Sequence, residues 1–299
     1  MLVSLACDTL EPSSFEPDVV VEAYLVAGET LSDVRLTRTV PIDQEYDADS
    51  LGVIGAEVHI ELLTEGGEVE QTYPYLARPL SNGRYVLDTR KLDLEGRDTR
   101  PSVQPLRSYR LVVQPPESNQ TITSVTTVPD TFQVLHVSSD SVVYRSDEPL
   151  IIEVSGSTYP GRQNVFVLTT TALEPSVSGL TPFAKAVYDN GDVSIAELAE
   201  NASPPLNEEN FERRSDGSLR AQYPWLGVSF YGRNRVTLRT LDENLYDFIR
   251  SQSVQQGGST LPPGEIPNVL EHVNGGRGVF GSVAEEGVEF VVLRDVGLD

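Results

Sequence analysis

The stretch Pro267–Ser282 reads PNVLEHVNGGRGVFGS and contains a dense group of glycines near the end of the chain. These glycines spell G-x-G-x-x-G, the dinucleotide-binding fingerprint, which requires a preceding strand and a helix that opens at the last glycine. Only residues 282–299 follow, whereas a βαβ unit needs about 30 residues. We therefore expect no bound cofactor but a structural turn over residues 274–281, formed by Gly275, Gly276, Gly278 and Gly281.

The residues on either side of this turn favour strands over much of the second half of the chain. Strand-like segments rich in β-branched and aromatic residues are Val134–Tyr144, Leu150–Val154, Val165–Thr171, Ser218–Phe230, Arg235–Thr240 and Val288–Leu293. Thr240 and Glu243 have the spacing of a capping box, and the apolar residues that follow predict a helix over residues 241–256. Residues 174–210 are rich in Pro, Ser, Gly and acid, which is typical of a long loop, with one short helical candidate at Val193–Glu200.

The first half of the chain has the same strand pattern. Residues 56–62, for example, alternate apolar and polar side chains, which is the period of a half-buried strand. About seven short strands separated by turn signals fall within residues 19–128, which predicts a β-sandwich of the immunoglobulin or fibronectin kind. Val128-Pro129-Asp130 marks a boundary. We expect a mainly β fold of two sandwich-like domains, residues 19–128 and residues 129–299, the second with the helix and the loop insertion.

The charge balance is strongly acidic. The chain has 22 Lys and Arg residues against 45 Asp and Glu residues, a formal net charge of -23, and only two of its basic residues are lysines, Lys91 and Lys185. Nucleic acid is therefore not an expected partner, because phosphate backbones are bound by clustered Lys and Arg. An acidic excess with so little lysine resembles proteins of salt-loving bacteria, although a GC-rich genome would also explain it.

Cys7 is the only cysteine, so no intrachain disulfide is expected. Residues 2–7 read LVSLAC, which looks like the end of a bacterial lipoprotein signal peptide, in which the cysteine becomes acylated. Residues 1–18 are accordingly interpreted as a signal remnant and an acidic tether. The alternative is a small buried or frayed cysteine near a terminus. No stretch approaches 18 uninterrupted apolar residues, so a lipid would be the expected anchor.

No catalytic or metal motif is evident. His59, His136 and His272 are isolated, so a zinc site is not expected, and neither a G-x-S-x-G elbow nor a P-loop occurs. Two acidic segments, residues 43–49 and 189–192, offer oxygen ligands for calcium, but neither has the spacing of an EF-hand. A solvated loop and a hairpin turn are the favoured interpretations of these two segments.

Tyr223, Trp225 and Tyr231 form the densest aromatic group. Such rings could stack on a sugar ring as ligand contacts. Alternation along a strand would equally bury them in a sandwich core, and the core is the favoured interpretation.

Together these residues resemble a known family. The resembling features are Cys7 ahead of the first strand, Val20-Val21-Glu22-Ala23, Leu36-Thr37-Arg38-Thr39, Gly55-Ala56-Glu57-Val58, Tyr109 with Leu111, Val128-Pro129, Tyr246-Asp247-Phe248, and Asn268-Val269 leading to the glycine stretch. In their order and spacing they are similar to the Bacteroidota lipoproteins grouped as domain of unknown function 4249. The resemblance implies an envelope lipoprotein of two β-rich parts, often encoded beside TonB-dependent outer-membrane transporters, with no established activity. Residues 174–210 do not match, which leaves a ligand site unassigned.

The leading hypothesis is a non-enzymatic lipoprotein of the bacterial envelope, anchored to the outer membrane through Cys7. It would act as an accessory or ligand-binding partner of a TonB-dependent receptor, with a glycan or a peptide as ligand. One alternative is a secreted carbohydrate-active hydrolase, which two unpaired carboxylates in a groove beside Trp225 would favour. Another is a purely structural or adhesive module, expected if no sizeable concave pocket exists.

Overall fold

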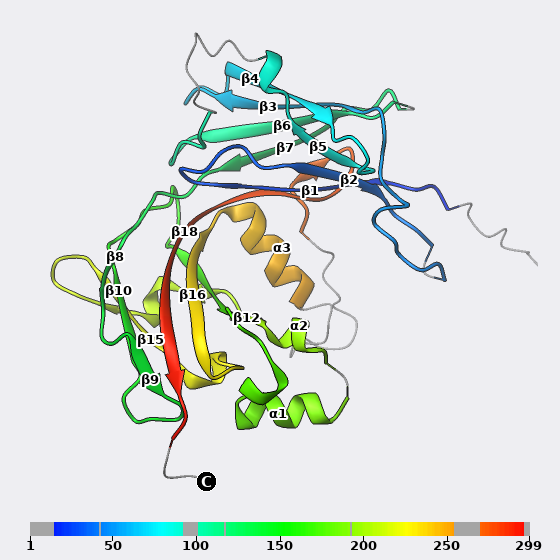
Figure 1. Cartoon of the computed structure of the whole chain (residues 1–299). Coiled ribbons are helices and arrows are strands. Elements are labelled where there is room, and N and C mark those ends of the chain that lie inside the picture. Colours follow the sequence, from blue (N-terminus) through cyan, green and yellow to red (C-terminus); the bar gives the residue numbers. More distant parts are fainter. Residues whose placement is uncertain are drawn as a thin grey trace, which may run out of the picture.

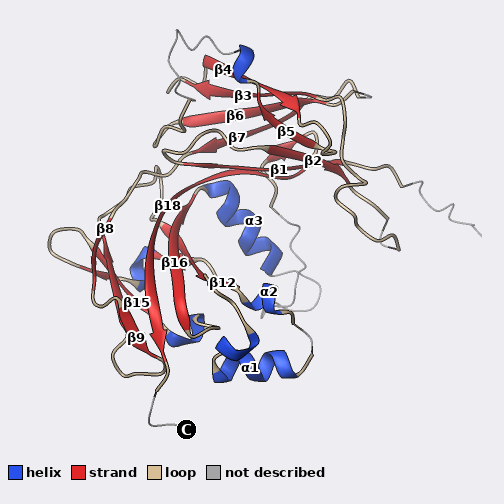
Figure 2. Ribbon diagram, viewed as in Figure 1, coloured by secondary structure: helices blue, strands red, loops and turns tan. Residues whose placement is uncertain are grey.

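The computed structural model describes residues 15–41, 43–91, 101–116, 118–191, 193–253 and 270–295 (Figure 1). The fold is mainly β, as the sequence predicts, and consists of two β-sandwiches stacked end to end (Figure 2). Cys7 lies outside the described residues, so the structure does not bear on its acylation. No helix within the described ranges is long and apolar enough to cross a membrane.

The first sandwich contains seven strands from the first half of the chain. They are β1 (Val19–Val26), β2 (Val34–Arg38), β3 (Glu57–Leu63), β4 (Val69–Ala77), β5 (Arg84–Leu87), β6 (Ser108–Gln114) and β7 (Ile122–Thr127), with a 3₁₀ turn η1 (Thr89–Lys91) after β5. The strands follow the order β1-β2-β5-β4-β3-β6-β7. Alternate residues point inward, so that Val21, Leu36, Ile60 and Leu111 meet in one buried core.

The second sandwich has a large and a small sheet. Its strands are β8 (Val134–Val137), β9 (Ser141–Val143), β10 (Leu150–Val154), β11 (Val165–Ala172), β12 (Glu200–Ala202), β13 (Leu206–Asn207), β14 (Glu212–Arg213), β15 (Leu219–Tyr223) and β16 (Gly232–Leu241). The small sheet has the order β14-β15-β10-β8 and packs on β11 and β16. Ile152, Phe166, Leu219 and Leu238 belong to the core between them.

The last strand, β18 (Arg277–Leu293), runs through both sandwiches (Figure 1). Its residues 277–283 pair in parallel with β1, and its residues 283–292 pair with β16. Phe280 therefore packs in the first core and Phe290 in the second. The expected assignment of residues 129–299 to one domain needs correction here, because β17 (Val273–Asn274) and the start of β18 complete the first sandwich.

The predicted glycine turn is too long. The bend covers only Gly275 and Gly276, between β17 and β18, whereas Gly278 and Gly281 lie inside β18. Gly278 has φ +99°, and a Cβ there would overlap the carbonyl of Val21 in β1. A Cβ at Gly281 would overlap the side chain of Leu245, which lies in the helix that precedes β18. Because glycine has no Cβ, β18 can approach β1 and α3 closely at these two positions.

The predicted helix over residues 241–256 is confirmed in type but begins later, as α3 (Glu243–Ser253); residues 254–256 are outside the described part. Thr240 is not its cap. It is buried at the end of β16, where its hydroxyl donates to the Ala284 carbonyl at 3.3 Å. Asp242 caps α3 instead, accepting the Leu245 N–H at 2.9 Å. The strand pairing of β16 with β18 extends to Leu241 and so displaces the helix start.

The expectation of a long loop over residues 174–210 is wrong. The segment contains the 3₁₀ turns η2 (Val177–Gly179) and η3 (Glu208–Asn210), the helices α1 (Pro182–Asp189) and α2 (Ile195–Leu198), and the strands β12 and β13. Pro182 occupies the first turn of α1, where its missing N–H costs nothing, and Ala184 packs in a small core with Phe230. The predicted short helix is α2, which a Ser194–Glu197 capping box starts.

Candidate functional site

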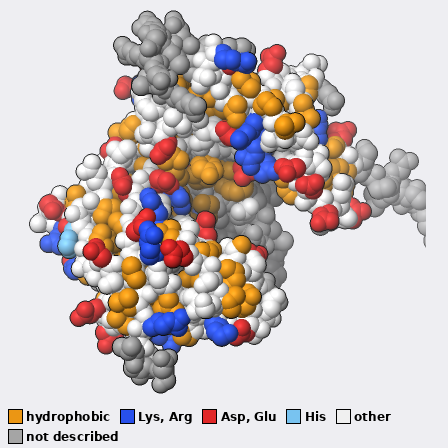
Figure 3. All heavy atoms as spheres, viewed as in Figure 1, with side chains coloured by type: hydrophobic (Ala, Val, Ile, Leu, Met, Phe, Trp, Pro, Cys, Tyr) orange, Lys and Arg blue, Asp and Glu red, His pale blue; other side chains and the backbone are white. Residues whose placement is uncertain are grey.

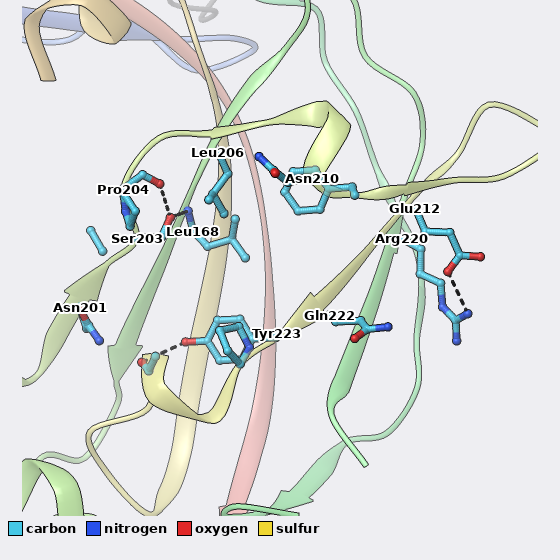
Figure 4. Close-up of a pocket in the computed structure, with 14 residues that line it drawn as sticks. Leu168, Asn201, Ser203, Pro204, Leu206, Asn210, Glu212, Arg220, Gln222 and Tyr223 are labelled. Carbon is cyan, nitrogen blue, oxygen red and sulfur yellow. Dashed lines mark hydrogen bonds and ion pairs between the residues drawn. The ribbon is translucent and has the colours of Figure 1, made fainter. Parts of the chain in front are cut away.

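The second sandwich is open along one edge, and the opening is a cavity of about 610 Å³. The cavity lies between the β12–β13 edge of the large sheet and the β14–β15 edge of the small sheet (Figure 4). The volume is within the range of ligand pockets, about 300 to 1,000 Å³. One wall comes from residues 201–212, which include the end of the segment 174–210 that has no match in the family resemblance.

The floor of the cavity is apolar. Leu168 and Tyr223 are each only 5% exposed, and Leu206 and Phe211 are half-buried beside them. The Phe211 ring packs edge-on against Phe166, with centroids 5.2 Å apart. The Tyr223 hydroxyl donates to the Gly227 carbonyl at 3.0 Å, and burial raises the pKa of this phenol. The Tyr223 hydroxyl is therefore neutral near pH 7, and its hydrogen bond to Gly227 fixes the ring in place.

The rim of the cavity carries exposed primary amides. Asn201, Asn210 and Gln222 surround the Tyr223 ring in Figure 4, and within the described part of the chain none of the three amides has a hydrogen-bond partner. Ser203 is different, because its hydroxyl accepts the Leu168 N–H at 3.0 Å and donates to a backbone carbonyl at 2.9 Å. Each free amide offers both a donor and an acceptor to a ligand.

The three aromatic residues singled out in the sequence do not form one surface. Tyr223 is buried in the sandwich core, Tyr231 is half-buried against it, and Trp225, in the 3₁₀ turn η4 (Trp225–Gly227), is 37% exposed. The Tyr144 ring lies between the other two, with centroids 5.6 Å from Trp225 and 5.6 Å from Tyr231. The Arg145 guanidinium covers Trp225 at 4.8 Å. Of the three, only Tyr223 lines the cavity.

The sequence did not identify the three amides or Phe211 as site residues, because single Asn, Gln and Phe residues in a polar segment form no motif. Trp225 instead borders a second hollow of about 80 Å³, where Glu148 is the one carboxylate among the described lining residues. The pair of carboxylates that would favour a hydrolase there is not found among them.

A third hollow, of about 750 Å³, separates the two sandwiches, and Figure 3 shows apolar side chains within it. Its floor includes Val167, Leu241 and Val283, which are buried against Leu245 of α3. These residues already form a core, so we assign this hollow to the seam between the sandwiches.

Two of the three isolated histidines each lie beside one carboxylate. His272 Nε2 is 2.8 Å from Asp247, and His59 Nε2 is 3.4 Å from Glu61. Among the described residues, no three His, Cys, Asp or Glu side chains stand close enough together to hold a metal ion. In the acidic segment after β2, Asp47 accepts the Asp49 N–H at 3.1 Å, which is the geometry of a local turn.

The fold is therefore that of a two-sandwich β protein whose last strand joins both units. Residues 8–287 match the family described as Domain of unknown function (DUF4249). The chain belongs to this family. No curated protein matches it.

Similar solved structures include trypsin-activated α2-macroglobulin from Escherichia coli, at 12% identity and a TM-score of 0.21 over 76% of this chain. The chain spans 14% of that protein's length. Three N-terminal domains of the outer capsid protein Hoc of bacteriophage RB49 are similar at 11% identity and a TM-score of 0.23, over 93% of this chain and 71% of that one. TM-scores this low establish neither a shared arrangement nor a shared function.

Proposed function

We propose that this chain is a non-enzymatic lipoprotein of the bacterial outer membrane that binds a ligand as the accessory partner of a TonB-dependent receptor. The observation that carries the binding role is the edge cavity, with its apolar floor and three amides free of described partners. A purely structural module would not need a concave site of this size. The membrane and receptor parts of the proposal rest on Cys7 and on the family resemblance.

The chemistry of the cavity favours binding over catalysis. Its described lining includes one carboxylate, Glu212, which lies 3.4 Å from the Arg220 guanidinium. A glycosidase needs a second carboxylate about 5 to 10 Å from the first. Neutral amides hold a ligand by hydrogen bonds and cannot serve as general acids or bases at neutral pH.

The arrangement along the chain also suits an anchored binding protein. The described chain enters the first sandwich, at β1, whereas the cavity is in the second sandwich (Figure 1). A lipid on Cys7 would hold the first sandwich near the bilayer. The cavity would then face away from the attachment point, where a receptor or its ligand can reach it.

The test is purification of the C-terminally tagged chain from its native envelope in mild detergent, with mass spectrometry of the proteins that accompany it. We expect a stoichiometric outer-membrane β-barrel. Recovery of the chain alone would refute the receptor role.

The anchor is tested separately with Cys7→Ser, expressed in the native host. We expect the variant to move from the membrane fraction to the soluble fraction on cell fractionation, because the acyl chains would be lost. Cys7→Ser protein that stays in the membrane fraction would refute lipidation as the anchor.

A further inference from the structure

The strand β15 has an open edge inside the cavity. Its neighbour β14 is only two residues long and pairs with Arg220 and Leu219, so within the described part of the chain residues 221–223 of β15 have no strand partner on that side. Asn210 and Phe211, which lead into β14, line the cavity and are not paired with residues 221–223, so the cavity has room for a further segment beside β15.

The direction of the free backbone groups follows from the ladder. Arg214 N donates to the Ser218 carbonyl at 2.9 Å, so Ser218 faces β14, and in a strand every second residue faces the same way. Ile151, which lies opposite Gln222, turns its carbonyl away from β15 and accepts the Ser138 N–H at 2.9 Å. Both observations indicate that the backbone N–H and C=O of Gln222 point toward the cavity. Neither group has a hydrogen-bond partner in the described part of the chain.

We propose that the cavity binds an extended peptide segment, which continues the line of β14 and pairs with Gln222 as an added strand. This inference rests on the proposed ligand-binding role and names the class of ligand. An exposed strand edge recognises an extended peptide through its backbone, and nearby pockets accept alternate side chains.

The rest of the cavity suits such a segment. Side chains of an added strand alternate between two directions, so one residue would face the apolar floor of Leu168, Leu206 and Phe211. Asn201 and Asn210 on the rim can each donate to and accept from one peptide group. The opposite edge, β12, is the weaker candidate for pairing, because Pro204 and Pro205 follow it and carry no N–H.

A glycan fits this site less well. Sugar hydroxyls can bond to the amides, but they do not reproduce the donor and acceptor pair that one strand residue presents. The rings that stack on sugars need an exposed face, and the Tyr223 ring at the floor is almost fully buried.

The experiment selects binders to the full chain from a library of random linear 12-residue peptides and measures the affinity of the enriched peptides. The decisive variants are Gln222→Pro and Gln222→Ala. Both remove the side-chain amide, but only proline removes the N–H, which is not used in the folded chain as described. Loss of one backbone hydrogen bond predicts an affinity about tenfold lower for Gln222→Pro than for Gln222→Ala.

A second measurement covers the case in which Gln222→Pro does not fold. Selected peptides are resynthesised with N-methyl groups at alternate residues, which keeps the side chains and removes the strand donors. We expect one of the two methylation patterns to weaken binding to the unaltered chain by about tenfold or more, because it removes the strand donor that pairs with Gln222. The proposal is overturned if no peptide is enriched, if proline and alanine variants bind equally, or if both methylated forms bind as tightly as the unmethylated peptide. Recovery of the receptor with the unaltered chain is independent of all three outcomes, so the two proposals fail separately.

Discussion

Two regions of the molecule use similar polar residues for different purposes. At the junction where β18 passes from one sandwich to the other, the Thr126 hydroxyl lies 2.5 Å from Asp242 Oδ2 and 2.6 Å from the Ser282 hydroxyl. The Asn244 amide donates to the carbonyls of Val125 and Phe280, at 2.8 and 2.7 Å. At the edge cavity, the amides of Asn201, Asn210 and Gln222 have no described partner.

This difference indicates that the polar groups at the junction stabilise the fold, whereas those at the edge cavity serve ligand binding. Buried polar groups are costly unless they are paired, so a fully paired junction holds the two sandwiches together. Exposed polar groups without partners add nothing to folding and are available to a ligand. Substitutions should therefore lower stability at the junction and lower binding at the edge.

The largest effect is expected for Gly278→Ala, in the part of β18 that leads to the junction and pairs with β1. Its φ of +99° disfavours any side chain, and the new Cβ would overlap the Val21 carbonyl of β1. We expect the free energy of unfolding to fall by about 4 kcal/mol or more, measured by urea denaturation. Gly161→Ala is the control, because Gly161 has φ +82° but nothing within 4 Å of the new Cβ. Its cost should be about 1 kcal/mol, and equal costs at both sites would show that the approach of β18 to β1 is not tight.

Gly278 shows which features of the fold could be predicted from the sequence and which could not. The strand patterns predict a mainly β fold and two sandwiches, because alternation is a local property of the chain. The role of Gly278 depends on a parallel pairing with a strand more than 250 residues earlier, and no local pattern encodes that partner. The same holds for Thr240, whose strand pairing with β18 overrides a good capping box.

The candidate site was less predictable than the fold. The segment from Asn201 to Glu212 has the composition of a loop, and its strands are only two or three residues long. They exist because β11 and β15 offer edges to pair with, which is a tertiary effect. Tyr223, Trp225 and Tyr231 were the candidate ligand contacts in the sequence, yet only the buried Tyr223 lines the cavity.

The second prediction concerns the charge at the junction. Burial raises the pKa of Asp242 to about 6, and hydrogen bonds from Thr126 and the Leu245 N–H offset only part of this rise. An Asp in the unfolded chain titrates near about 3.9. The folded state therefore binds the proton more tightly than the unfolded state. Protonation of Asp242 contributes about 3 kcal/mol to the free energy of unfolding below about pH 4, and this stabilisation is lost as pH rises through about 6.

Asp242→Asn removes this titration and keeps an oxygen to cap α3. The stability of the variant relative to the unaltered chain should rise by about 3 kcal/mol between about pH 4 and pH 7. The measurement is urea unfolding of both proteins across that range. Parallel stability curves would mean that Asp242 is not buried as a charged group at neutral pH.

The third prediction removes a paired amide. In Asn244→Ala the carbonyls of Val125 and Phe280 lose their donor in a site where Asn244 is only 6% exposed. Two unsatisfied carbonyls should cost about 2 kcal/mol, measured by the same urea titration. A neutral result would show that water replaces the amide and that the junction is less closed than its contacts indicate.

The smallest effect on stability is expected for the matching amide at the edge. Asn210→Ala deletes an exposed side chain with no described partner, so unfolding should change by no more than about 0.5 kcal/mol. Binding of a selected peptide should weaken by about three- to tenfold, because one hydrogen bond to the ligand is lost.

The two asparagine variants are compared in one experiment with two measurements, in which Asn244→Ala lowers stability and Asn210→Ala lowers affinity. If Asn210→Ala lowered stability as much as Asn244→Ala, the edge amides would be structural and the contrast between the two regions would not hold. If it left both quantities unchanged, peptide contact at this side of the cavity would be excluded, and pairing at Gln222 would have to provide the affinity alone.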